Sequence, residues 1–220
     1  MTDAIEQYMR DCMCDSAHDT QHVYRVLNYA MDIAAHEPGV DPEILRAACL
    51  LHDIGRAEQY ADPRVDHAAC GAEKARAWLE ANGHSADFAR AVGGCILAHR
   101  FRSGHPPASL EAKILFDADK LDACGAMGIA RTLLYNGIVG LPLYMLGEGG
   151  AVLDGTADTQ NTFFREYKFK LEKLYGRFYT ERGEALAQSR RKAAREFYEA
   201  LLREARECHG IKLITQGEPQ

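Results

Sequence analysis

Leu-Leu-His-Asp-Ile-Gly at residues 50–55 is the stretch that decides the fold class and points to a function. The apolar block at residues 47–51 has the three-to-four-residue periodicity of a buried helix, and a histidine and an aspartate follow it directly. An unpaired carboxylate in apolar surroundings is costly, so His52 and Asp53 need a cation or dedicated hydrogen bonds. Adjacent helical residues point about 100° apart. His52 and Asp53 can therefore bind the same ion only near the end of the helix, where Gly55 lets the chain turn away.

The periodicity of the remaining sequence predicts an all-α fold, because no alternating run is long enough to indicate a strand. Asp41, Pro42 and Glu43 are typical of a helix start. The Gly-rich segment 137–155 should be irregular, and whether it forms a lid is left open. The predicted helices cover about residues 3–13, 18–36, 42–51, 66–82, 85–99, a long one from Ser109, 161–180 and 184–208. The last of these is expected to bury Leu186, Ala193, Phe197, Leu201 and Ala205.

Length and composition favour one domain over residues 1–220, with a core at about 18–130 and C-terminal helices at about 161–208 packed on it. The formal charge of −6 argues against a nucleic-acid clamp. There is neither an apolar run of the ~20 residues that a membrane span needs nor a signal-peptide pattern, so we expect a cytoplasmic protein without membrane partners. The seven cysteines include no closely spaced zinc-type pair, which argues against a disulfide framework and a structural zinc site.

Two further segments place polar residues where a helix should be buried. His18 and His22 are four residues apart and share a helix face, with His22 at the edge of the apolar arc. Downstream, Asp117, Asp119 and Asp122 interrupt an apolar pattern. Together with the central pair, two imidazoles and two carboxylates from three helices form a nitrogen and oxygen ligand set that suits a catalytic divalent metal.

The order of His22, His52-Asp53 and Asp119 resembles the metal-dependent HD-domain phosphohydrolase superfamily, an all-helical fold with one or two central divalent ions. The similarity covers about residues 18–130. By this resemblance, the metal ligands are His22, His52, Asp53 and Asp119. The resemblance implies Mn²⁺ or Mg²⁺ as the ion, with Fe, Co, Ni and Zn left open.

The segment 111–131 is more specific. Its Asp-Ala-Asp-Lys-Leu-Asp-Ala core, followed by Gly-Ile-Ala-Arg, resembles the bacterial HD branch of nucleotide pyrophosphohydrolases. Members of that branch release pyrophosphate from nucleoside triphosphates. After His99, however, Arg-Phe-Arg replaces the short serine-containing stretch of that branch.

His67 and His99 occupy positions similar to those of the extra histidines in dinuclear HD proteins, so a second metal is left open. Lys120, Arg100 and Arg102 are the candidate phosphate contacts, although Lys120 is as well explained by a structural ion pair. His18, His67 and His99 are candidate proton donors. Asp122 is a candidate for orienting a ligand histidine or for positioning water.

We therefore expect a divalent-metal-dependent phosphohydrolase that cleaves a nucleoside triphosphate to the monophosphate and pyrophosphate, with a phosphorylated small molecule as its partner. The catalytic candidates are Asp53, His18, His67, His99, Lys120 and Asp122. The alternatives are a nucleoside monophosphate phosphatase or phosphodiesterase, a dinuclear iron oxygenase of the HD type, and a nucleotide sensor without turnover. The oligomeric state is left open.

Overall fold

The computed structural model describes residues 2–13, 20–100 and 104–210. In these residues the chain is helical, and the only β pairing is a bridge between Leu146 and Val152. None of the described helices is both long and apolar enough to cross a bilayer. The chain divides into two compact units, Met1–Ala123 with Gly176–Gln188, and Cys124–Tyr175 with Ser189–Gln220. A single domain over residues 1–220 stays a prediction.

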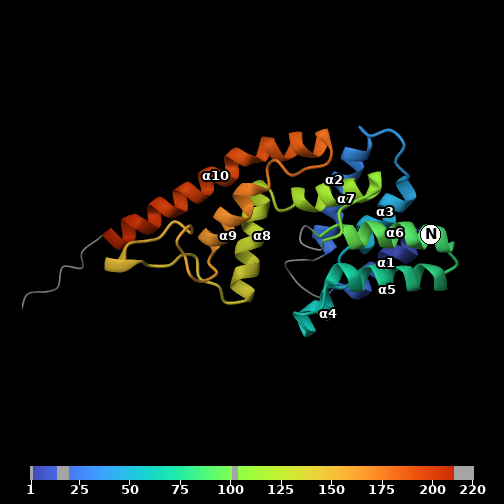
Figure 1. The fold of residues 1–220 in the computed structure, drawn as a ribbon, viewed down its shortest axis with the longest axis horizontal. Coiled ribbons are helices and arrows are strands. Elements are labelled where there is room, and N and C mark those ends of the chain that lie inside the picture. Colours follow the sequence, from blue (N-terminus) through green and yellow to red (C-terminus); the bar gives the residue numbers. More distant parts are fainter. Residues whose placement is uncertain (1, 14–19, 101–103, 211–220) are drawn as a thin grey trace, which may run out of the picture. The chain divides into compact units, whose positions relative to one another are not determined.

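The first unit carries the helices around the central histidine and aspartate. They are α1 (Thr2–Cys12), α2 (Thr20–Ala34), α3 (Pro42–Leu51), α4 (Arg56–Ala61), α5 (His67–Ala81), α6 (Ala86–Ala98) and α7 (Leu110–Leu121). Helix α2 packs against α3 and α7, and α6 packs against α3, α5 and α7 (Figure 1). Most of these helices were predicted within a few residues, whereas the short α4 was not.

Side-chain caps fix where the helices of this unit begin. The Asp41 carboxylate accepts hydrogen bonds from the amides of Glu43 and Ile44 at 3.0 and 3.1 Å, which confirms the predicted start of α3. Asp66 caps α5, and Ser109 caps α7. The apolar faces of α2 and α3 are buried, with Val26, Ile33 and Leu45 all at 0% exposure. These faces meet in the core next to the polar cluster.

The second unit contains α8 (Gly125–Ile138), a 3₁₀ turn (Glu148–Gly150), α9 (Phe163–Phe169), a second 3₁₀ turn (Leu171–Lys173) and most of α10 (Glu181–Gly210). Its core is aromatic, and the rings of Tyr167 and Tyr198 stack with their centroids 4.1 Å apart. Segment 137–155 is largely irregular, as predicted.

Three helix predictions were wrong in extent or register. The helix from Ser109 is two helices, because Gly125 at φ +67° begins α8 and a Cβ there would lie 2.8 Å from Cβ of Arg190. The helix predicted over 161–180 ends at Phe169. In α10 the buried residues are Ala187, Ala194, Tyr198 and Ala205, whereas Phe197 is 42% exposed.

Candidate metal centre

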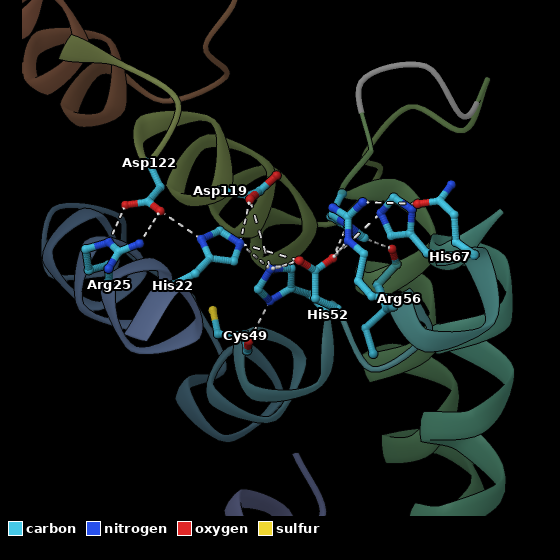
Figure 2. A network of polar contacts seen from close by, with 12 residues as sticks. His22, Arg25, Cys49, His52, Arg56, His67, Asp119 and Asp122 are labelled. Atoms are coloured by element: carbon cyan, nitrogen blue, oxygen red, sulfur yellow. Dashed lines mark hydrogen bonds and ion pairs between the residues drawn. The ribbon is translucent and has the colours of Figure 1, made fainter. Parts of the chain in front are cut away.

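Four side chains from α2, α3 and α7 converge in the first unit. His22 comes from α2, His52 ends α3, Asp53 follows it, and Asp119 lies in the last turn of α7 (Figure 2). His22 Nε2 lies 3.3 Å from His52 Nε2, 3.5 Å from Asp53 Oδ2 and 3.4 Å from Asp119 Oδ1. Atoms that bind one ion at about 2.0–2.2 Å stand roughly 2.8–3.6 Å apart. The spacing therefore fits a single ion.

Hydrogen bonds on the outer ring nitrogens aim both imidazoles inward. Nδ1 of His22 lies 2.8 Å from Asp122 Oδ2, and Nδ1 of His52 lies 2.8 Å from the Cys49 carbonyl oxygen. Both partners can only accept, so Nδ1 carries the proton in each ring and Nε2 presents a lone pair. Arg25 donates to both oxygens of Asp122, at 2.7 and 3.0 Å, and fixes that carboxylate. This is the arrangement in which metal-ligating histidines are held in proteins.

The charge states of these groups also favour a cation. Burial lowers the pKa of His52 to about 4, so the ring is neutral at pH 7. Burial by itself raises the pKa of Asp53, but the positive charge of Arg56, together with contacts to the neighbouring imidazoles, outweighs it and holds that pKa well below its usual range. Burial alone would also raise the pKa of Asp119. Contacts with the neighbouring histidines, mainly His22, outweigh this effect and lower the pKa. Two imidazole lone pairs and two carboxylate oxygens therefore face one another. A bound cation would relieve the repulsion between these electron-rich atoms.

Exposure differs within this set and shows where a substrate can reach it. The side chains of His22, His52 and Asp53 are at most 1% exposed, whereas Asp119 is 29% exposed. Asp119 is therefore the candidate ligand on the open side of the cluster.

A second group of potential ligands adjoins the first and shares Asp53 with it. His67 begins α5 and His99 ends α6, and their Nε2 atoms lie 3.6 and 3.7 Å from Asp53 Oδ1. Both rings are buried, at 3% exposure. Among the described residues, neither ring nitrogen of His67 nor Nε2 of His99 has a hydrogen-bond partner. Asp53, His67 and His99 together are thus also able to hold a metal.

Gly55 brings His67 to this position through close packing. A Cβ at residue 55 would lie 2.3 Å from the His67 carbonyl oxygen and 2.7 Å from the Gly71 amide nitrogen. The φ angle of Gly55 is −92°, which other residues also adopt. The chain does turn at residues 52–55, as expected, but the reason for the glycine differs, because it is the contact with α5 that excludes a side chain.

Arg56 is a residue of the cluster that the sequence analysis missed. Its Nε donates to Asp53 Oδ1 at 2.9 Å, and its side chain is 19% exposed. Burial and the Arg56 charge lower the pKa of His67 to about 3. The only signal in the sequence is a cation three residues after an aspartate, a spacing that pairs charges on helices in general.

The other predicted site residues lie outside the cluster or outside the described residues. Arg100 pairs with Asp66 at 3.0 Å. The Lys120 ammonium donates to the Arg177 carbonyl oxygen and lies 3.6 Å from the Phe116 ring centroid, contacts that favour a structural role. His18 and Arg102 lie outside the described residues.

Comparison with known proteins agrees with this geometry. Residues 20–124 match the HD domain family. The chain is 32% identical to the uncharacterized protein YpgQ of Bacillus subtilis over 147 residues, which are 64% of this chain and 68% of YpgQ. The chain belongs to the HD superfamily. It is also similar to a predicted HD superfamily hydrolase from an uncultured Thermotogales bacterium, with 31% identity, coverage of 92% and 91%, and a TM-score of 0.61.

The crystal structure of Bacillus subtilis YpgQ in complex with ADP has a TM-score of 0.72 and 26% identity, and the match covers 93% of this chain and 97% of that one. Together with the hydrolases of this superfamily, these likenesses identify the chain as a metal-dependent hydrolase. The predicted fold class and family are confirmed.

Proposed function

We propose that this hydrolase cleaves a nucleoside triphosphate to the monophosphate and pyrophosphate with Mn²⁺ or Mg²⁺. The observation that carries the metal site is the convergence of two inward-facing Nε2 atoms on two carboxylate oxygens, within 3.3–3.6 Å of one another at most of the contacts. The complex of YpgQ with ADP supports a nucleotide as the substrate class. The resemblance of residues 111–131 to the pyrophosphohydrolase branch supports the scissile bond.

His22, His52, Asp53 and Asp119 would hold the ion, which supplies a water of lowered pKa and neutralises charge on the phosphoryl group. Neutral His67 carries one acceptor and one donor nitrogen, so it can accept a hydrogen bond from water or donate one to a phosphate oxygen. Arg100, whose side chain is 34% exposed and pairs with Asp66, is proposed to contact the terminal phosphates. Arg102 is proposed for the same role from its sequence position alone.

The test follows the phosphorus products. We expect ³¹P NMR of reactions incubated with Mn²⁺ and a panel of nucleoside triphosphates, and freed of Mn²⁺ before the measurement, to show pyrophosphate and monophosphate appearing together, with no earlier orthophosphate. Asp53→Asn should abolish this turnover, because it removes the negative charge that both ligand groups share. Orthophosphate appearing first, or cleavage of monophosphates alone, would place the protein with nucleotidases instead.

A further inference from the structure

The two oxygens of Asp53 face different surroundings. Oδ2 lies 3.5 and 3.6 Å from the Nε2 atoms of His22 and His52, and no described residue gives it a hydrogen bond. Oδ1 lies toward His67 and His99, and here a cation is already present, because Arg56 Nε donates to it at 2.9 Å. The Asp53 carboxylate therefore belongs both to a candidate ligand set that needs a cation and to one that already has the Arg56 guanidinium beside it.

Further hydrogen bonds fix the Arg56 side chain in this position. Its Nη1 donates to Gln59 Oε1 at 3.2 Å, and Gln59 Nε2 in turn donates to the Val65 carbonyl oxygen at 3.2 Å. Gln59, on the same helix α4, thus helps to hold the Arg56 guanidinium beside Asp53. The planar fork of arginine keeps its charge at any pH at which the protein folds.

A second ion and this guanidinium would compete for one place. An ion about 2.1 Å from Oδ1 would lie at most ~5 Å from Arg56 Nε, given the 2.9 Å hydrogen bond. Like charges at that separation repel strongly beside a carboxylate as buried as Asp53, at 0% exposure of its side chain. His67 and His99 bring no negative charge to offset the repulsion, since both are uncharged as metal ligands.

We infer that Arg56 takes the place of the second metal ion, so that the protein binds one divalent ion, at His22, His52, Asp53 and Asp119. His67 and His99 remain beside this ion as neutral hydrogen-bonding groups. The inference rests on the proposed metal site and deepens it. It also excludes dinuclear iron oxygenase chemistry, which requires both ligand sets to be filled.

The experiment measures how many Mn²⁺ ions the chelator-stripped, full-length protein binds, by titration calorimetry and by electron paramagnetic resonance. We expect one Mn²⁺ for the wild type, without the spectrum of a coupled ion pair. Arg56→Gln should bind two, with the affinity of the second site raised at least tenfold and a coupled-pair spectrum. Arg56→Lys keeps the positive charge and should still bind one.

Arg100→Gln is the matched control, because Arg100 also acts on His67 but pairs with Asp66 and not with Asp53. It should bind one ion. Arg56→Met, similar in length to arginine, gives a second neutral variant, and circular dichroism verifies that each variant is folded. Two ions in the wild type, or a single ion in both folded neutral variants, overturns the inference. A wild type that binds no Mn²⁺ contradicts the proposed function instead.

Discussion

Asp122 would act on the proposed metal site through a neighbour, since its carboxylate contacts His22 Nδ1 while Nε2 of the same ring faces the cluster. Such a partner sets the tautomer and raises the basicity of the ring. The sequence could indicate this role, because Asp122 lies one helical turn from Asp119. It could not indicate the role of Arg56, because an arginine at a helix start is usually solvated, and its burial here depends on the packing of α4 against α5.

Asp122→Asn should weaken Mn²⁺ binding by about 10–100-fold while leaving the four ligands in place. The cause is the loss of the negative charge that holds the Nδ1 proton and thereby aims Nε2. Asp32→Asn is the matched control, because Asp32 pairs with Arg182 at 2.9 Å in the same unit and contacts no ligand. Calorimetry with Mn²⁺ checks both variants. If both variants lose the same Mn²⁺ affinity, the effect comes from the change in net charge. If Asp122→Asn binds Mn²⁺ as tightly as the wild type, the orienting role is contradicted.

At the scale of elements, the starts of helices were easier to predict than their faces. Asp41 and Ser109 cap helices through contacts within three residues, which the sequence displays directly. The face of α10 was assigned one residue away from the buried one over residues 186–198, because Phe197 and Tyr198 are both aromatic and the surrounding residues do not distinguish them, whereas the predicted burial of Ala205 is confirmed. Contacts between distant segments, such as the one between Gly55 and α5, could not be predicted, because the sequence shows the glycine but not the segment that packs against it.

Gly55→Ala should destabilise the protein by about 1–3 kcal/mol, as overpacked substitutions do, and weaken metal binding. The added Cβ would meet the His67 carbonyl oxygen and the Gly71 amide, which are backbone atoms and can yield only if α5 moves. Gly94→Ala in α6 is the control, because nothing lies within 4 Å of its Cβ. It should be neutral or stabilise by up to ~1 kcal/mol. Urea unfolding of the two variants measures the difference, and a neutral Gly55→Ala would show that the packing is not tight.

At the scale of the whole chain, residues 176–188 return to the first unit, and one of their contacts there is with a buried carboxylate. Asp117, at 0% exposure, accepts hydrogen bonds from the amides of Tyr179 and Thr180 and from the Thr180 hydroxyl, at 2.7–3.0 Å. These bonds hold the chain outside a helix just before α10. In the apolar pattern Asp117 and Asp119 are similar acids two residues apart; the family resemblance indicated Asp119 as a ligand, whereas the role of Asp117 became visible only in the fold.

Asp117→Asn and Asp119→Asn should therefore have opposite signatures. An asparagine at 117 turns an amide donor toward backbone donors, so the variant should lose about 1–3 kcal/mol of stability, and the amides of residues 179 and 180 should exchange hydrogen faster. Its Mn²⁺ affinity should stay the same. Asp119→Asn should keep the wild-type exchange at those amides and lose Mn²⁺ affinity, because a ligand charge is removed. Hydrogen exchange mass spectrometry and Mn²⁺ calorimetry on both variants test this. If Asp117→Asn also loses the metal, the anchor and the site are coupled through α7, and Asp117 acts on the metal as well as on the chain.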